Sequence, residues 1–173
     1  VGLWTVIVYT LIIIGLIGGC FSIFFIGSKL QGKPDLQVND LLSAESSHIY
    51  DINGDLIGDV GTQIRTNVTY DQVPEALVDA FVSIEDSRFF EHNGFDISRF
   101  TKAMLENIKA MRFAQGGSTF TMQLVKNTYF QVDDLNSGTM AAKSIDRKVQ
   151  EIWLAINLEK KIDKKRIFEL YMN

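Results

Sequence analysis

The longest apolar stretch of the chain lies at its N-terminus. No charged residue occurs in residues 1–28, and residues 4–26 are almost entirely apolar. Because a helix needs about 20 such residues to cross the hydrocarbon core of a bilayer, the pattern predicts a transmembrane helix over residues 1–28. The alternative is a cleavable signal peptide, whose apolar core is usually only about 7–15 residues long. The run continues past Cys20 to Ile26, which favours an uncleaved single-pass anchor.

A polar segment and a short β pattern follow the apolar stretch. Residues 29–46 contain Gly32 and Pro34 and are expected to form a juxtamembrane linker. Two short runs, 48–51 and 55–58, flank the dipeptide Asn53-Gly54, which tolerates the positive φ of a tight turn, so they predict a β-hairpin. Alternating residues over 62–70 predict one further short strand.

The rest of the chain has helical periodicity, which predicts a mainly α fold behind the small hairpin. One amphipathic helix is predicted from Pro74 to Glu85, and a second from Asp96, a suitable N-cap, to Met111. Further helices are predicted after residue 119, over about 139–158 and from Asp163 onwards, with a polar loop over 131–138. The apolar faces of the first two helices are expected to lie in the core; they consist of Ala76, Leu77, Ala80, Phe81 and Ile84, and of Ile97, Phe100, Met104, Ile108 and Met111.

Composition narrows the classes of function. The net charge is -4 and the pI about 5.2, so the overall balance gives no indication of nucleic-acid binding. The single cysteine, Cys20, excludes an intrachain disulfide and a cysteine metal site. The 173 residues amount to one domain. Because the last residues fall inside a helical pattern, we expect the domain to be truncated at its C-terminus.

The first candidate for chemistry is the segment of residues 83–96. Glu85 and Asp86 end a predicted helix, and Phe89, His92 and a turn at Asn93-Gly94 follow. A carboxylate at a helix end, beside aromatic surface, can be partly desolvated and still reach a cleft, which suits a general base. The same residue types also fit a helix end whose acids face water.

The second candidate is the glycine-rich segment of residues 115–119. Its two glycines permit close approach of a ligand to the backbone, and Ser118 or Thr119 can cap the following helix. The N-terminus of a helix attracts anions. Gln123, Lys126 and Asn127 follow at helical spacing, so these residues predict a phosphate site. An ordinary connection between two helices explains the same residues.

The third candidate is Glu151, the only ionisable residue from Val149 to Leu158. A carboxylate in so apolar a run is usually paired or functional, because burying it without a partner is costly. Arg147, four residues earlier, is its expected partner. The apolar stripe of this helix is predicted on nearly the opposite side, at Ile145, Val149, Ile152 and Ile156. The basic cluster 160–166 suits either anionic lipid headgroups or a solvated loop in which Asp163 caps the next helix.

Four segments, in order, resemble the motifs of the peptidoglycan glycosyltransferase domain (glycosyltransferase family 51) of class A penicillin-binding proteins and monofunctional cell-wall glycosyltransferases. Residues 85–94 fit E-D-x-x-F-x-x-H-x-G, and residues 116–127 resemble G-G-S-T-x-T-Q-Q-x-x-K-N. Residues 147–159 are similar to R-K-x-x-E-x-x-x-A-x-x-L-E, and residues 167–173 to a motif that commonly ends Y-L-N. Met122 departs from the second motif by replacing the first glutamine, whereas Gln123 matches the second.

This resemblance implies a lysozyme-like helical fold, with an anchor at 1–28, a linker at 29–46 and an incomplete glycosyltransferase domain at 47–173. It implies an enzyme that polymerises lipid II into glycan strands by inverting transfer, with undecaprenyl pyrophosphate as the leaving group. The domain is expected on the extracytoplasmic side of the bacterial cytoplasmic membrane. Its expected partners are lipid II, the growing lipid-linked chain, the membrane, and cell-division or elongation proteins. No cofactor is required, and a divalent cation (Mg or Mn) near Glu151 is the one candidate.

The resemblance also implies roles for individual residues. Glu85 is the general base that deprotonates the 4-hydroxyl of the incoming disaccharide, and Glu151, also catalytic, orients the cations around the pyrophosphate or helps to hold a metal. The implied substrate-binding residues are Asp86, Phe89, His92, Gly117, Ser118, Thr119, Gln123, Lys126, Asn127, Arg147 and Lys148.

Two other functions use some of the same residues. A lysozyme-like glycoside hydrolase also places two carboxylates around a glycosidic bond, but it has no need for Lys126, Arg147 and a glycine-rich helix start. A non-catalytic, membrane-tethered scaffold of the cell-wall machinery would predict the loss of Glu85 or Glu151, and both are present.

Overall fold

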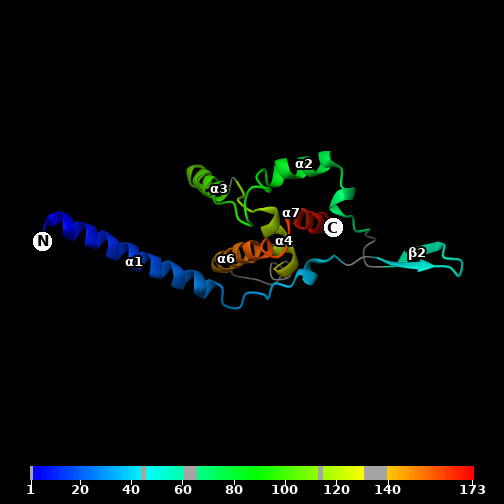
Figure 1. Ribbon diagram of the computed structural model, residues 1–173, viewed down its shortest axis with the longest axis horizontal. Helices are drawn as coiled ribbons and strands as arrows, with labels where there is room; N and C mark the ends of the chain where they lie inside the picture. The colour runs from blue at the N-terminus through cyan, green and yellow to red at the C-terminus, as the bar shows by residue number, and fades with distance from the viewer. Residues whose placement is uncertain (1, 44–45, 61–65, 113–114, 131–139) are drawn as a thin grey trace. The chain divides into compact units, whose positions relative to one another are not determined.

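The computed structural model describes residues 2–43, 46–60, 66–112, 115–130 and 140–173 (Figure 1). These residues are mainly helical with one two-stranded sheet, as predicted. The chain divides into two compact units: unit 1 comprises residues 1–34 and 137–150, and unit 2 comprises residues 35–136 and 151–173. The predicted loop over 131–138 lies outside the described residues. In chain order the elements are α1 (Leu3–Lys29), η1 (Val38–Leu41), β1 (Ser47–Tyr50), β2 (Leu56–Val60), η2 (Tyr70–Gln72), α2 (Glu75–Glu85), α3 (Ile97–Ala110), α4 (Phe120–Tyr129), α6 (Met140–Leu158) and α7 (Lys164–Met172).

In unit 1, helix α1 is long and apolar enough to cross a membrane. Its 27 residues, at about 1.5 Å each, exceed the thickness of the hydrocarbon core. The hydroxyls of Thr10 and Ser22 donate to carbonyl oxygens four residues earlier, at 2.9 and 2.8 Å, so these polar groups are satisfied within the helix. Lys29 at its end forms an ion pair with Asp146 of α6 at 2.8 Å.

The β-hairpin has the predicted position and turn. Strands β1 and β2 are antiparallel, and Gly54 has φ 89°. The further strand predicted over 62–70 is wrong where the structure describes it, because residues 66–69 are irregular and Tyr70 begins η2. Instead, the Asn173 side chain bonds the N–H and the C=O of Val68, both at 2.9 Å. The Asn173 side chain thus forms the backbone hydrogen bonds that a neighbouring strand would otherwise form with Val68.

An aromatic core in unit 2 joins three segments that are distant in the sequence. Phe89 precedes α3, Phe120 begins α4 and Phe168 lies in α7, and all three side chains are fully buried. Their rings meet edge to face, with centroids 5.2 Å apart for Phe89–Phe120 and 5.7 Å apart for Phe120–Phe168, a favourable geometry for aromatic pairs. Leu36 and Leu41, from the segment predicted as a linker, belong to the same core.

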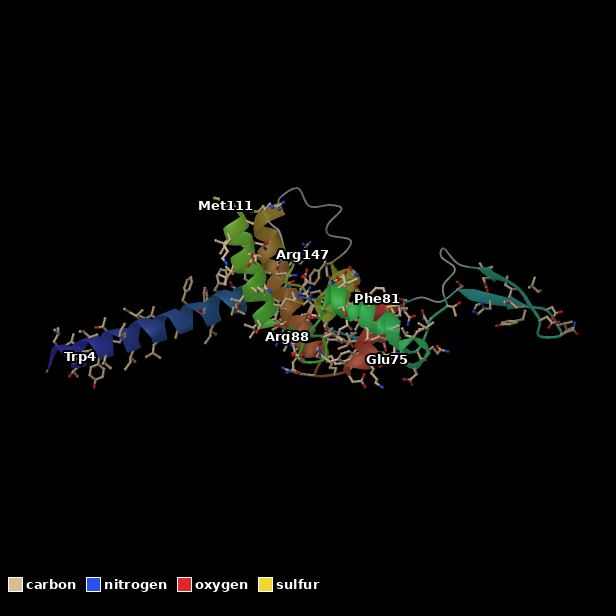
Figure 2. All side chains as sticks on the ribbon, turned by 90° about the horizontal axis from the view of Figure 1, so that it is seen from above. Trp4, Glu75, Phe81, Arg88, Met111 and Arg147 are labelled. Atoms are coloured by element: carbon tan, nitrogen blue, oxygen red, sulfur yellow. The ribbon has the colours of Figure 1, made fainter. Side chains whose placement is uncertain are left out.

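The apolar faces predicted for α2 and α3 are wrong as core faces. In α2 only Val78 is buried, and in α3 only Ala103. Ile84 is 78% exposed and Met111, which Figure 2 shows at the end of α3, is 92% exposed. Helical periodicity identifies the side of a helix that is apolar, but it does not show whether another element covers that side. Phe81 and Phe100 are half-buried; the other predicted members, Ala76, Leu77, Ala80, Ile97, Met104 and Ile108, are exposed.

The buried side of α6 also differs from the predicted stripe. Ile145 is exposed, and Val149, Ile152 and Ile156 are only half-buried. The residues that face the core of unit 2 are Glu151, Leu154, Ala155 and Leu158. The predicted carboxylate therefore lies on the buried side of the helix, within the i, i+3, i+4, i+7 pattern of its core residues.

The buried side of α6 makes a close backbone contact at Gly94. Gly94 has φ 88°, and a Cβ atom placed on it would lie 2.6 Å from the carbonyl carbon of Ala155. The Gly94 carbonyl also accepts a 2.8 Å hydrogen bond from the Thr119 hydroxyl. The glycine of the first motif therefore holds the start of α4 and the backbone of α6 against one loop.

We expect Gly94→Ala to destabilise the protein by roughly 1–3 kcal/mol or more, because the added methyl overlaps the α6 backbone. Chemical denaturation gives the free energy of unfolding. Gly54→Ala is a matched control, since Gly54 has nearly the same φ of 89° but no atom within 4 Å of the position that an added methyl would take, so only backbone strain is added. Equal losses for the two variants would contradict the close contact at Ala155.

Candidate active site

The two adjacent carboxylates at the end of α2 lie in different environments. Helix α2 ends at Glu85, and Asp86 leaves the helix with φ -155° and ψ 71°. As a result, Asp86 is fully buried whereas Glu85 is half-buried. One carboxylate therefore lies in the interior while the other lines a cavity.

Asp86 holds three segments together. Its Oδ2 accepts hydrogen bonds from His92 Nε2 at 2.9 Å and from the Phe120 amide at 3.1 Å. Its Oδ1 accepts from Arg99 Nη1 at 3.4 Å. Hydrogen bonds from a cation and a backbone amide compensate for the burial of a carboxylate. Asp86 thus fixes the loop after α2 to the first turns of α3 and α4.

A second layer of contacts lies behind His92. Lys164 Nζ is 3.4 Å from His92 Nδ1, 2.7 Å from Glu159 Oε2 and 4.5 Å from the centroid of the Phe89 ring. The Thr121 hydroxyl donates to Glu159 Oε1 at 2.5 Å. Because an ammonium group only donates, Nδ1 of His92 accepts and its Nε2–H points to Asp86.

Sequence patterns did not single out Lys164 for this role. The cluster 160–166 suits lipid headgroups or a solvated loop, but the Lys164 side chain is only 20% exposed and its ammonium is paired. Asp163 caps α7 as predicted, by accepting from the Arg166 amide at 2.8 Å. That cap places Lys164 in the first turn of α7, but Lys165 and Arg166 share this turn, so the sequence pattern does not separate Lys164 from its basic neighbours.

Glu85 lines a cavity of about 410 Å³. Its carboxylate accepts a hydrogen bond from Gln123 Nε2 at 3.1 Å, and the Tyr171 hydroxyl lies 3.4 Å from Gln123 Oε1. The structure therefore brings together predicted residues of the first and second motifs. The lining residues are Glu85, Arg99, Gly116, Ser118, Gln123, Lys126 and Asn127.

Arg99 was not predicted, although it lies in the wall of two cavities. The second cavity, of about 490 Å³, shares Arg99 and Gly116 with the first and also contains Arg88 (labelled in Figure 2) and Lys102. Arg99 lies three residues after Asp96, whose side chain accepts from its amide at 3.0 Å and caps α3 as predicted. The caps of α3 and α4 thus place Arg99 and Lys126 in the wall of the Glu85 cavity.

The start of α4 is more occupied than an open phosphate site. Thr119 is the N-cap and accepts from the Met122 amide at 3.2 Å, while the Phe120 amide is bound to Asp86. Gly117 packs closely on Phe100, with a Cβ position only 3.1 Å from its Cα. Any anion in the cavity therefore meets the side chains of Ser118 and Lys126 and the open backbone at Gly116, which has no neighbour within 4 Å of its Cβ position.

Met122, the departure from the second motif, lies in the core. Its side chain is fully buried, whereas the adjacent Gln123 lines the cavity. Successive residues of a helix point about 100° apart, so the two positions face different surroundings. The substitution therefore changes core packing and leaves the amide that contacts Glu85 in place.

Eight of the predicted site residues are not among those that line the Glu85 cavity: Asp86, Phe89, His92, Gly117, Thr119, Arg147, Lys148 and Glu151. Glu151 is buried in α6, and Arg147 and Lys148 belong to unit 1, so their roles toward substrate stay predictions. Within the described parts of the chain, no group of three or more His, Cys, Asp or Glu side chains fits a metal ion. A divalent cation near Glu151 likewise stays a prediction.

Comparison with known proteins identifies the family. Residues 53–173 match the family model described as transglycosylase. The chain belongs to the transglycosylase family. It is 38% identical over 175 residues to penicillin-binding protein 1A/1B of Bacillus subtilis (strain 168), covering 99% of this chain and 18% of that protein. It is 43% identical over 156 residues to penicillin-binding protein 1A of Streptococcus pneumoniae (strain ATCC BAA-255 / R6), covering 90% of this chain and 20% of that protein.

These relatives confirm the resemblance to the glycosyltransferase domain of class A penicillin-binding proteins. A third, penicillin-binding protein 1A of Clostridium novyi (strain NT), is 43% identical over 150 residues, covering 83% of this chain and 17% of that protein. The chain spans about a fifth of the length of the curated relatives it matches.

We expect Lys164→Met to lower the free energy of unfolding by roughly 1–3 kcal/mol, because it leaves the nearly buried Glu159 carboxylate without its cation. Urea denaturation measures the loss. Lys109→Met is the control, since Lys109 is 73% exposed and its contact with Glu106 is 3.8 Å long. Similar small effects for both variants would show that Lys164 is not part of a structural network.

We expect alkaline pH to destabilise the protein partly through Tyr171. Burial, and secondly the charge of Glu85, raise the pKa of the Tyr171 hydroxyl above its usual value of 10.0. The unfolded chain therefore loses this proton at lower pH than the folded protein, and stability present below pH 10 declines as the pH rises through the folded pKa. Unfolding measured from pH 8 to pH 11 should show a smaller decline for Tyr171→Phe. Tyr129, whose pKa burial also raises, accounts for part of the remainder.

Proposed function

We propose that this domain is a peptidoglycan glycosyltransferase that polymerises lipid II, with Glu85 as the general base. The observation that supports it most directly is the Glu85 cavity, which one half-buried carboxylate lines together with Lys126 and Arg99. A transferase whose leaving group is a pyrophosphate needs a proton acceptor and nearby cations in one site. Family membership supports the same reaction class.

In the proposed reaction Glu85 removes the proton from the 4-hydroxyl of the incoming lipid-linked disaccharide. The hydroxyl oxygen then forms a bond to the anomeric carbon of the growing chain, with inversion at that carbon. The bond from this carbon to the pyrophosphate oxygen breaks, and its electron pair leaves with undecaprenyl pyrophosphate. Gln123 keeps the Glu85 carboxylate in place by donating to it at 3.1 Å.

The cations of the cavity are proposed to stabilise the departing pyrophosphate. Lys126, a half-buried residue of α4, and Arg99, a half-buried residue of α3, both line the cavity. Their charge acts where negative charge develops, in a site partly shielded from water. Arg147 and Lys148 are proposed to join them, with Glu151 orienting these cations.

The candidate span α1 fits substrates that are themselves attached to lipid. We propose that it anchors the domain at the extracytoplasmic surface of the cytoplasmic membrane, where both the donor and the acceptor lie. Proteins of division or cell elongation are proposed partners of the complete protein.

The geometry favours transfer over hydrolysis by a lysozyme-like enzyme. A glycosidase requires a second carboxyl group about 5–9.5 Å from the first. Among the residues that the structure describes, Glu85 is the only carboxylate lining its cavity, and the other charged residues there are Arg99 and Lys126. A non-catalytic scaffold has no need for a carboxylate held by Gln123 in an open cavity.

Glu85→Gln in the full-length, membrane-bound protein should reduce polymerisation of labelled lipid II about 10²- to 10⁴-fold, the range for loss of a general base. Glu91→Gln is the matched control, because Glu91 belongs to the same motif but its side chain is 66% exposed and pairs with Arg88 at the surface. Gel separation of glycan strands measures both.

Equal polymer from the parent and Glu85→Gln would show that Glu85 is not the base. Cleavage of preformed glycan, without polymer from lipid II, would favour the hydrolase.

A further inference from the structure

Gln123 lies between Glu85 and Tyr171, which belongs to the fourth motif but received no role in the sequence analysis. Its Nε2 donates to Glu85 at 3.1 Å, and its Oε1 lies 3.4 Å from the hydroxyl of Tyr171, in the last turn of α7. We propose that Tyr171 is a positioning residue for the general base and acts through the amide of Gln123. This inference rests on the proposed role of Glu85.

The two ends of the Gln123 amide have nearly the same shape and opposite hydrogen-bonding character. An ionised Glu85 only accepts, so the NH₂ end must face it; the reversed amide would oppose two acceptor oxygens. A hydroxyl that donates to Oε1 stabilises the productive orientation from the far side. Tyr171 meets this requirement only while it keeps its proton.

Tyr171 is held rigidly enough to act in this way. Its ring packs on Phe120 with a centroid distance of 4.5 Å and on Phe81 at 6.4 Å. Burial and the Glu85 charge raise the pKa of Tyr171, so the hydroxyl remains a donor at neutral pH. Because the ring contacts do not involve the hydroxyl, Tyr171→Phe removes one hydrogen bond and preserves the packing.

The loss should appear in catalysis rather than in substrate binding. Tyr171 is not among the residues that line the Glu85 cavity, so its hydroxyl affects the substrate through Gln123 and not by direct contact there. Without the hydroxyl, the amide of Gln123 occupies the reversed orientation for part of the time, and Glu85 then lacks its donor. The turnover number therefore falls while the KM for lipid II stays constant.

The test compares the full-length parent with Tyr171→Phe in lipid II polymerisation. We expect kcat to fall about 3- to 10-fold, the effect of one neutral hydrogen bond, with KM within about twofold and a melting temperature lowered by no more than about 4–8 °C, the cost of that bond. Tyr70→Phe is the matched control: its ring also packs in the aromatic core, 5.8 Å from Phe168, and it should leave both constants unchanged.

A spectroscopic measurement tests the contact without relying on activity. In protein labelled with ¹⁵N-glutamine, the side-chain NH₂ signal of Gln123 is assigned by its absence in Gln123→Leu. In Tyr171→Phe we expect this signal to shift and its protons to exchange with solvent about several-fold faster, because the amide loses its hydrogen-bonded orientation. In Tyr70→Phe we expect neither change.

An unchanged kcat and an unchanged Gln123 signal in Tyr171→Phe would overturn the inference, as would a rise in KM alone. Glu85→Gln in the same assay separates the two failures. If Glu85→Gln is inactive while Tyr171→Phe behaves as Tyr70→Phe, only the role of Tyr171 is wrong. If Glu85→Gln remains active, the proposed base is wrong and the role of Tyr171 in catalysis falls with it.

Discussion

The site depends on one buried carboxylate. Asp86 is fully buried and accepts hydrogen bonds from a histidine, an arginine and the first amide of α4. Without these donors the charge would be too costly to bury. Their presence makes the adjacent Glu85 the carboxylate that remains available to the cavity. Sequence neighbours of the same chemistry thereby acquire different tasks, because the chain leaves the helix between them.

Helix α7 supports both carboxylates from behind. Lys164 in its first turn contacts His92 and Glu159, and Tyr171 in its last turn contacts Gln123. Between them Phe168 packs into the aromatic core. Helix α7 therefore makes polar contacts at both of its ends and apolar contacts at its centre. The packing of Phe168 in the core fixes the position of the helix and thereby the positions of both polar contacts.

The sequence predicted the elements and the members of the site better than their surroundings. The turn at Gly54 and the caps at Asp96 and Asp163 depend on local geometry, which short patterns encode. The grouping of Glu85 with Gln123 and Lys126 joins distant parts of the chain, and only the resemblance to the family implied it. The exposure of Ile84 and Met111 and the burial of Lys164 depend on which distant segments pack against them. One amino-acid sequence does not show which distant segments pack against each other. The lysozyme-like arrangement and the joint action of Glu85 and Glu151 stay predictions for the same reason.

The cap of α4 determines which of its side chains take part in chemistry. Thr119 starts the helix and is itself fixed to Gly94 by a 2.8 Å hydrogen bond. With about 100° between successive residues, this starting point directs Met122 into the core and Gln123 into the cavity. Removing a single residue between the cap and Met122 would move each following residue back by one position, placing the Gln123 amide in the hydrophobic interior and the Leu124 side chain beside the carboxylate. In the family's second motif, the number of residues between the helix cap and Gln123 therefore matters as much as the residue types.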